Sequence, residues 1–229
     1  MIIKNILNVF FITSFINLSE CNYLLFKNLR LTKLKTNNTP LKYYSNKFTK
    51  NLLNDNINNY DLYNGNNIKF IDTIHNISLE HIYPRSMLSN DISACQDMHN
   101  LYLTHKHYNN HRSNYKYICE DSYINIKELL ICFDKECKNL KCNNFNLYIP
   151  FDYSRGKISR SIAYMYLIYP ELCDIHKIND FILEVELLKE WNKQYPPDNE
   201  EYERNRLIKL FQGNFNPFID NHKLINKIF

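Results

Sequence analysis

Glycine is scarce in this chain, and this scarcity narrows the possible folds more than any other feature. The 229 residues include 3 glycines, at Gly65, Gly156 and Gly213, and no two of them lie close together. Loops that wrap nucleotide phosphates need several glycines within a few residues, because the backbone must approach the phosphate closely. The sequence therefore excludes the P-loop and the dinucleotide-binding fingerprint. It also lacks the Gly-x-Ser-x-Gly and His-Glu-x-x-His motifs of common hydrolases.

The positive charge of the chain is concentrated near its N-terminus. The formal net charge is +4, but residues 22–53 hold seven basic side chains and no acidic one. Residues 54–229 hold 20 basic and 23 acidic side chains. Any nucleic-acid binding by this later part must therefore use a local basic patch, because its overall charge is slightly negative.

The first 21 residues resemble a secretory signal peptide. Lys4 precedes an apolar run of 13 residues from Ile6 to Leu18, which is shorter than the roughly 20 residues of a membrane span. A short apolar run after a basic residue is typical of a cleaved signal. An uncleaved anchor and a buried first helix are the alternatives.

Residues 22–60 form a basic segment rich in Asn and Lys, without clear periodicity. This composition is typical of a solvated spacer, and equally of an organelle transit peptide. The leader therefore predicts entry into the secretory pathway. The destination is either a secreted, periplasm-like compartment or a plastid-type organelle reached by a two-part leader.

Residues 61–229 are expected to form one folded domain. Hydrophobic periodicity and turn signals predict strands at 68–74, 78–83 and 100–103, with loop and bend at 91–99. Helices are expected within 105–117, 159–169 and 180–194. Asp198 and Glu201 resemble a capping box that opens a further helix, which Gly213 would end.

Six cysteines fall inside this domain. In an oxidising compartment an even number of cysteines predicts disulfides. Zinc ligation is less favoured, because Cys132, Cys137 and Cys142 are spaced five residues apart and do not form a Cys-x-x-Cys pair. The remaining three are Cys95, Cys119 and Cys173.

The densest cluster of polar side chains runs from Leu79 to Asn114. Glu80 and Asn109 offer hard oxygen ligands that suit Mg²⁺, and His81 can take a proton from water near neutral pH. Arg85 and Arg112 are candidates for holding a phosphate. Together these residue types predict metal-assisted hydrolysis of a phosphodiester.

The local geometry permits this only under one condition. Glu80 and His81 are adjacent, so on a regular strand their side chains would point to opposite faces. Both can reach one site if the strand ends there, and Pro84 is a reason for an early end. Asn109 lies 28 residues after His81, so the helix that carries it would have to pack back against the end of this strand.

Seven polar motifs follow one another in order along the chain. They are Glu80-His81-Ile82-Tyr83-Pro84, Asp97-Met98-His99-Asn100-Leu101, Asn109 with Arg112-Ser113-Asn114, Arg155 through Arg160 with Tyr164-Met165, Trp191-Asn192 with Pro197, Glu201 with Arg204-Asn205, and Gln212 through Asp220. This ordered series resembles the endonuclease I family of secreted nucleases, in the His-Me finger (ββα-metal) superfamily. The motifs cover roughly residues 75–222.

The resemblance implies roles for the site residues. His81 corresponds to the general base, and Glu80 and Asn109 to the two protein ligands of one Mg²⁺, for which Mn²⁺ or Ca²⁺ could substitute. Arg85 or Arg112 would hold the scissile phosphate. The remaining family positions near the site are expected to be structural, and they are Asp97, His99, Asn100 and Asn114.

Two other sets of polar residues allow two interpretations each, and a third pair has one. One set is the four histidines His99, His105, His107 and His111, which could form a zinc cluster. Alternatively, His99 is a structural hydrogen-bonding residue and the other three lie on the surface. Arg155, Lys157 and Arg160 could touch a nucleic-acid backbone or lie on a solvated helix start. Glu201 and Arg204 are expected to form a packed salt bridge.

The expected fold is α+β, with a ββα-metal finger embedded in a mostly helical single domain. The expected function is Mg²⁺-dependent, sequence-tolerant cleavage of DNA, with RNA as a further substrate, leaving 5′-phosphates. We expect a monomer that contacts the phosphate backbone and has no stable membrane association after leader removal. The alternatives are a secreted nucleic-acid-binding protein without catalysis and a disulfide-rich structural protein.

Overall fold

The computed structural model describes residues 53, 60–68, 76–119, 130–134, 139–142, 145–182 and 185–229. Side chains are not described for residues 130–134, 139–142, 145–146, 179 and 181. The expected signal peptide, nearly all of the expected 22–60 spacer and most of the expected strand at 68–74 lie outside these residues. Within the described part, no helix combines the length and apolar character needed to cross a membrane.

Two antiparallel strands followed at once by a helix form one side of the molecule. Strand β1 (Ile77–His81) pairs with β2 (Leu101–His105), so that Glu80 lies opposite Tyr102 and His81 opposite Leu101. Helix α5 (Lys106–Arg112) follows β2 without a loop. The strands expected at 78–83 and 100–103 and the helix expected within 105–117 are thus confirmed, with shifted ends.

The segment that joins β1 to β2 is more ordered than expected. It contains the 3₁₀ helix η4 (Arg85–Met87) and the short helix α4 (Ile92–Cys95). The Asp91 carboxylate caps α4 by accepting a hydrogen bond from the Ala94 amide at 2.8 Å. The loop and bend expected at 91–99 therefore includes one helical turn, because an Asp cap satisfies its first free N–H group.

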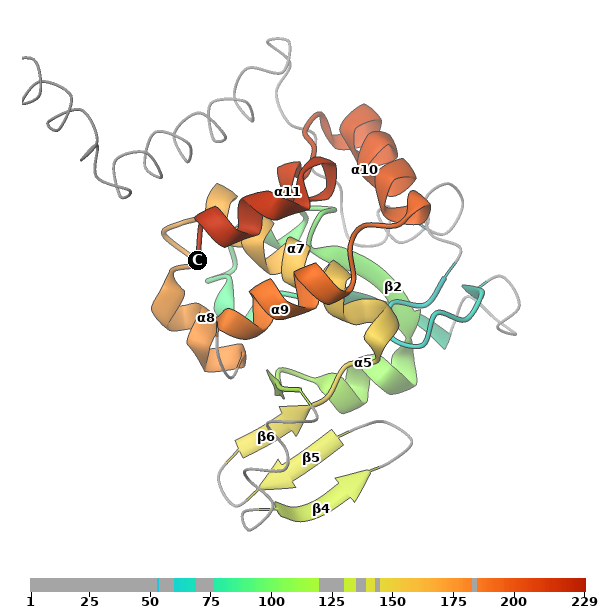
Figure 1. Cartoon of the computed structure of the whole chain (residues 1–229). Helices are drawn as coiled ribbons and strands as arrows, with labels where there is room; N and C mark the ends of the chain where they lie inside the picture. Colours follow the sequence, from blue (N-terminus) through green and yellow to red (C-terminus); the bar gives the residue numbers. More distant parts are fainter. Residues whose placement is uncertain are drawn as a thin grey trace, which may run out of the picture.

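A second sheet was not predicted. It contains β3 (Lys116–Tyr117), β4 (Leu130–Asp134), β5 (Asn139–Cys142) and β6 (Phe145–Tyr148), in the order β3-β6-β5-β4. Strands β3 and β6 are parallel, and the other pairs are antiparallel. Figure 1 shows β4, β5 and β6 at one end of the molecule, away from the helical part.

The remaining chain is helical, and α7 (Asp152–Ile168) lies at its centre. Around it are α8 (Ile175–Phe181), α9 (Glu186–Gln194), α10 (Asn199–Gln212), α11 (Pro217–Asp220) and the 3₁₀ helix η6 (His222–Lys227). The helix expected at 159–169 begins earlier than predicted. The overall class is α+β, as expected.

One helix prediction was wrong and one was confirmed in detail. The helix expected at 180–194 is divided into α8 and α9, because Ile182 adopts an extended conformation and forms a bridge with Tyr117.

The cap expected for α10 is present, since the Asp198 carboxylate accepts a hydrogen bond from the Glu201 amide at 2.8 Å. The helix ends at Gly213, whose φ of 102° requires glycine.

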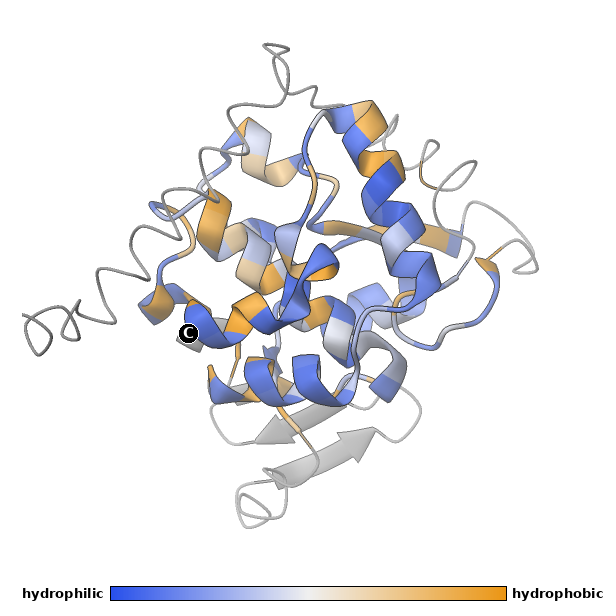
Figure 2. Cartoon of the chain, turned by 45° about the horizontal axis from the view of Figure 1, so that its top comes forward, coloured by the Kyte–Doolittle hydropathy of each residue, from blue (hydrophilic) through white to orange (hydrophobic). Residues whose placement is uncertain are grey.

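The interior contains many polar and charged side chains. Figure 2 shows hydrophobic and hydrophilic residues mixed on the helices, and thirteen of the 17 residues of α7 are buried, including Arg160. Arg112 and Arg204 are also almost completely buried.

Leu53 is fully buried in a second apolar cluster with Ile77 and Ile208, although it falls within the expected spacer. Packing thus extends at least to Leu53.

The cysteines differ from the prediction. Cys95 and Cys173 are buried and have free thiols. The expected pairing of all six domain cysteines is therefore wrong for these two. Cys137 and the side chains of Cys132 and Cys142 lie outside the described part of the chain.

Candidate active site

A cavity of about 330 Å³ lies where β1 ends and faces the last turns of α5. It brings together six of the nine predicted site residues. The lining consists of Leu79, Glu80, His81, Pro84, Arg85, Ser86, Asn109, Arg112, Ser113 and Asn114. Because β1 ends at His81, the adjacent side chains of Glu80 and His81 both reach this one cavity, as the sequence condition required.

The His81 ring is held by the backbone of α4. Its Nε2 lies 2.9 Å from the carbonyl oxygen of Cys95. A carbonyl only accepts hydrogen bonds, so Nε2 must donate, and in the neutral ring Nδ1 is then the unprotonated nitrogen. Burial lowers the pKa of His81, and the positive charges of Arg85 and Arg112 lower it further. Both effects favour a neutral imidazole that can accept a proton at Nδ1.

The Glu80 carboxylate is buried and oriented by two donors. Its Oε1 accepts hydrogen bonds from the Tyr63 hydroxyl at 2.7 Å and from Arg112 Nη1 at 3.0 Å. Within the described residues, Oε2 accepts none. Burial raises the pKa of Glu80 to about 7, because loss of hydration outweighs the attraction of Arg112. An added cation near Oε2 would favour the ionised form.

Asn109 connects α5 to β1 through its side-chain amide. Its Nδ2 donates to Ser78 Oγ at 2.8 Å and to the carbonyl oxygen of Leu79 at 2.9 Å. The Leu79 carbonyl can only accept, so the nitrogen must face β1 and Oδ1 must face the other way. Oδ1 accepts no hydrogen bond from the described residues.

The donor set fits a hard divalent cation. Glu80 Oε2 and Asn109 Oδ1 are oxygen atoms that accept no hydrogen bond from the residues that the structure describes, and both residues line the same cavity. Mg²⁺ usually takes one or two protein oxygens and keeps several waters. The described residues contain no group of three His, Cys, Asp or Glu side chains arranged to hold a metal.

Arg112 does not take the role of a phosphate contact that was expected for it. Its side chain is 1% exposed. Nη1 donates to Glu80 and to the carbonyl oxygens of His81 (3.1 Å) and Ser113 (3.2 Å), and Nη2 donates to that of Ile82 at 3.0 Å. The guanidinium also lies 4.5 Å from the centre of the Tyr117 ring. Arg112 therefore braces the end of β1 from the inside, whereas Arg85 is exposed at the start of η4.

Three predicted structural residues lie behind the cavity. Asn100 holds the backbone of Tyr83 through both ends of its amide, at 2.7 and 3.1 Å. Asp97 accepts hydrogen bonds from the hydroxyls of Tyr164 and Tyr169, at 2.8 and 2.7 Å. His99 Nε2 lies 3.2 Å from the carbonyl oxygen of Asn214, and its ring packs against that of Tyr164 with the centroids 4.6 Å apart. The fourth residue, Asn114, is exposed and lines the cavity.

Sequence reasoning missed Tyr63 and Ser78. Tyr63 is fully buried, and its hydroxyl touches both Glu80 and Tyr117. The local signal was only a turn, in which the Asp61 carboxylate accepts hydrogen bonds from the amides of Tyr63 and Asn64. Nothing in the sequence around Tyr63, which lies 17 residues before Glu80, indicates that the two side chains are in contact.

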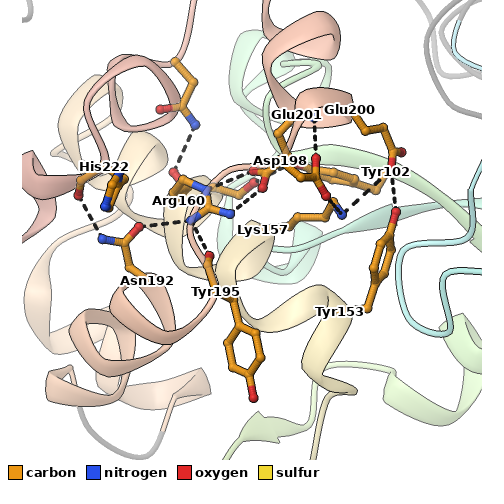
Figure 3. A network of polar contacts seen from close by, with 12 residues as sticks. Tyr102, Tyr153, Lys157, Arg160, Asn192, Tyr195, Asp198, Glu200, Glu201 and His222 are labelled. Atoms are coloured by element: carbon orange, nitrogen blue, oxygen red, sulfur yellow. Dashed lines mark hydrogen bonds and ion pairs between the residues drawn. The ribbon is translucent and has the colours of Figure 1, made fainter.

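A second polar network stabilises the helical part (Figure 3). Arg160 on α7 donates through Nε to Glu201 of α10 at 2.9 Å, and through Nη1 to the carbonyl oxygen of Tyr195 at 2.9 Å. A Cβ at Gly156 would lie 2.1 Å from that carbonyl oxygen, so glycine permits this close approach. The suggested contact between nucleic acid and Arg160 is therefore wrong, because its side chain is 2% exposed.

The partner expected for Glu201 was also wrong. Glu201 pairs with Arg160, whereas Arg204 donates to the carbonyl oxygens of Met98 and Leu101 and lies 3.8 Å from the Tyr102 ring centre. Lys157 pairs with Asp198 at 3.2 Å. These cations thus link α7 and α10 to each other and to the start of β2.

Comparisons with known proteins agree with the motifs. The Endonuclease I family model matches residues 25–223. An extracellular deoxyribonuclease of Aeromonas hydrophila is 42% identical over 67 residues, or 29% of this chain and 26% of the relative. A periplasmic deoxyribonuclease of the same organism is 38% identical over 66 residues, or 29% of this chain and 25% of the relative. The matched segment therefore spans about a quarter of these relatives.

Proposed function

Because this chain belongs to the endonuclease I family, we propose that it is a metal-dependent endonuclease that hydrolyses phosphodiester bonds in DNA. One observation carries the proposal. Glu80, His81 and Asn109 line a single cavity, and the His81 ring is held with Nε2 on a backbone carbonyl. A base and two hard oxygen ligands are the parts that metal-assisted phosphodiester hydrolysis needs.

We assign the metal site to Glu80 Oε2 and Asn109 Oδ1, with water in the other positions. A bound Mg²⁺ would neutralise charge on the phosphate and on the leaving 3′ oxygen. Tyr63 and Arg112 orient the Glu80 carboxylate, and Ser78 orients the Asn109 amide. These three contacts fix the ligands before a cation arrives. Mn²⁺ and Ca²⁺ prefer the same oxygen donors and could substitute.

His81 acts as the general base in this proposal. Its Nδ1 takes a proton from the water that attacks phosphorus, while Nε2 stays on the Cys95 carbonyl. The bond to the 3′ oxygen breaks, so the products carry a 5′-phosphate and a 3′-hydroxyl. Arg85, exposed at the cavity wall, is the remaining arginine placed to hold the phosphate.

Recognition through phosphates would make cleavage tolerant of base sequence, because phosphate contacts carry no direct sequence information. RNA presents the same phosphodiester and is a second expected substrate. The relatives named extracellular and periplasmic deoxyribonucleases favour a secreted site of action. They give no support to the plastid-type destination. We expect the protein to act as a monomer.

The test is nicking of supercoiled plasmid by the full chain, with Mg²⁺ or with EDTA, beside His81→Ala. Nicking that needs both Mg²⁺ and His81, with 5′-phosphate ends, is expected. Retention of DNA without nicking by a folded, Mg²⁺-binding protein would overturn the enzyme assignment and favour the non-catalytic binding protein. Loss of both binding and nicking in a folded protein would overturn the proposed substrate.

A further inference from the structure

Helix α5 carries two histidines, His107 and His111, on one face, and Asn109 on another. His107 is exposed and His111 is partly exposed. Their ring centroids are 4.4 Å apart, with the ring planes inclined at 54°. Residues four apart lie one above the other on a helix, whereas Asn109, two residues from each, lies on the opposite side. The pair is thus separate from the proposed Mg²⁺ ligands.

We propose that His107 and His111 form a second cation site, specific for a borderline transition-metal ion of the Zn²⁺ class. Neutral imidazoles at i and i+4 on one helix face are a zinc-binding arrangement, and imidazole nitrogen suits zinc and copper but not magnesium. The short distance between the two rings allows both to reach one ion. Water would complete the coordination.

The other nearby histidine has a different task. His105 Nδ1 accepts a hydrogen bond from the backbone amide of His107 at 3.1 Å and so caps α5. Its ring centroid is 6.4 Å from that of His107, compared with 4.4 Å for His111. The two-residue site is therefore the part of the suggested histidine cluster that the structure brings together.

Occupation of this site would affect the helix that carries Asn109. Helix α5 has 7 residues, which is too short to be stable by itself. An ion held by His107 and His111 links its two turns and adds binding free energy to the folded state only. Zn²⁺ is therefore expected to raise the melting temperature, whether or not the protein cleaves DNA.

The test is a Zn²⁺ titration of the ¹⁵N-labelled full chain, followed by the imidazole nitrogen signals. The matched variant combines Lys106→His with His107→Lys, which keeps the composition but places the histidines five residues apart, on different faces. His107 and His111 signals are expected to shift together in the wild type. Affinity at this helix should be at least about tenfold weaker in the matched variant, because losing a direct ligand costs no less than losing an outer-shell partner of a ligand.

A second variant, Glu80→Gln, removes the ligand proposed for Mg²⁺ and should leave this titration unchanged. Equal Zn²⁺ affinity at α5 in the wild type and the matched variant would overturn the proposal. So would a shift of only one of the two histidines, or a titration that disappears in Glu80→Gln. None of these outcomes depends on whether the chain is a nuclease.

Discussion

The imidazole of His81 donates through Nε2 to the carbonyl oxygen of Cys95, 2.9 Å away. This hydrogen bond joins the end of β1 to α4, and it determines which ring nitrogen is basic. Since α4 is one turn long, its Asp91 cap contributes to the position of the His81 ring as well as to the helix. The proposed base therefore depends on a short helix that does not itself line the cavity.

Replacing His81 by Ala should separate catalysis from metal binding. We expect the cleavage rate to fall by about 10²–10⁴-fold, the range that general-base catalysis contributes. Mg²⁺ affinity, measured by calorimetry, should remain, because His81 is not a proposed ligand. A variant that cleaves at the wild-type rate would contradict the role of His81 as base.

Replacing Asn109 by Ala should weaken Mg²⁺ binding. The variant loses Oδ1 and also the hydrogen bonds that join α5 to Ser78 and Leu79. Asn110→Ala is the matched control, because Asn110 is the next residue on the same helix and is exposed. Equal Mg²⁺ affinity of the two variants in calorimetric titration would remove Asn109 from the ligand set.

Tyr63→Phe tests whether the orientation of Glu80 matters. The variant keeps the buried ring but removes the donor to Oε1, so Mg²⁺ affinity should fall by about 10–100-fold, as for other outer-shell partners of metal ligands. Tyr83→Phe removes a hydroxyl that contacts Leu172 instead of Glu80 and should leave the affinity unchanged. If both variants bind Mg²⁺ like the wild type, Tyr63 has only a packing role.

The pH dependence of Mg²⁺ binding should report Glu80. Its pKa is raised to about 7 in the absence of a cation, so a proton competes with Mg²⁺ below this pH. The apparent Kd should rise about tenfold for each pH unit below 7 and level off above about 8, since one proton is displaced. Burial lowers the pKa of His81, so this ring is protonated at a lower pH than a free histidine. An affinity that is flat from pH 5.5 to 8 would exclude Glu80 as the ligand.

The ion pair between Arg160 and Glu201 should be important for stability. Both side chains are 2% exposed, so Arg160→Met would leave a buried carboxylate without its partner. The free energy of unfolding should fall by about 3–5 kcal/mol, as measured by urea denaturation. Arg206→Met breaks an exposed pair with Glu203 and serves as the control. A similar, small effect of both substitutions would show that the buried network is not needed for folding.

Local chemistry accounts for the parts that sequence reasoning predicted correctly. Strand alternation predicted β1 and β2, and the Asp198 cap with Gly213 predicted both ends of α10. These signals act between residues a few positions apart, so they survive in almost any tertiary context. The adjacency of Glu80 and His81 near Pro84 belongs to the same category.

The division between α8 and α9 shows where such signals fail. Residues 180–194 have helical periodicity, but Ile182 bridges Tyr117, a residue 65 positions earlier. A single long-range pairing outweighs the local preference, because propensity contributes only a few tenths of a kcal/mol per residue. The sequence contained no indication of this partner.

The sequence by itself determined which chemical groups are available, namely a histidine and two side chains with hard oxygen atoms, one of which is carried on a short helix. Tertiary structure alone decided how the charged and hydroxyl groups are used. It turned Arg112 inward as the partner of Glu80 and brought Tyr63 onto the same carboxylate. The physical reason is that a buried charge must find its compensating partner across the fold, and the distance along the chain does not restrict which partner that is.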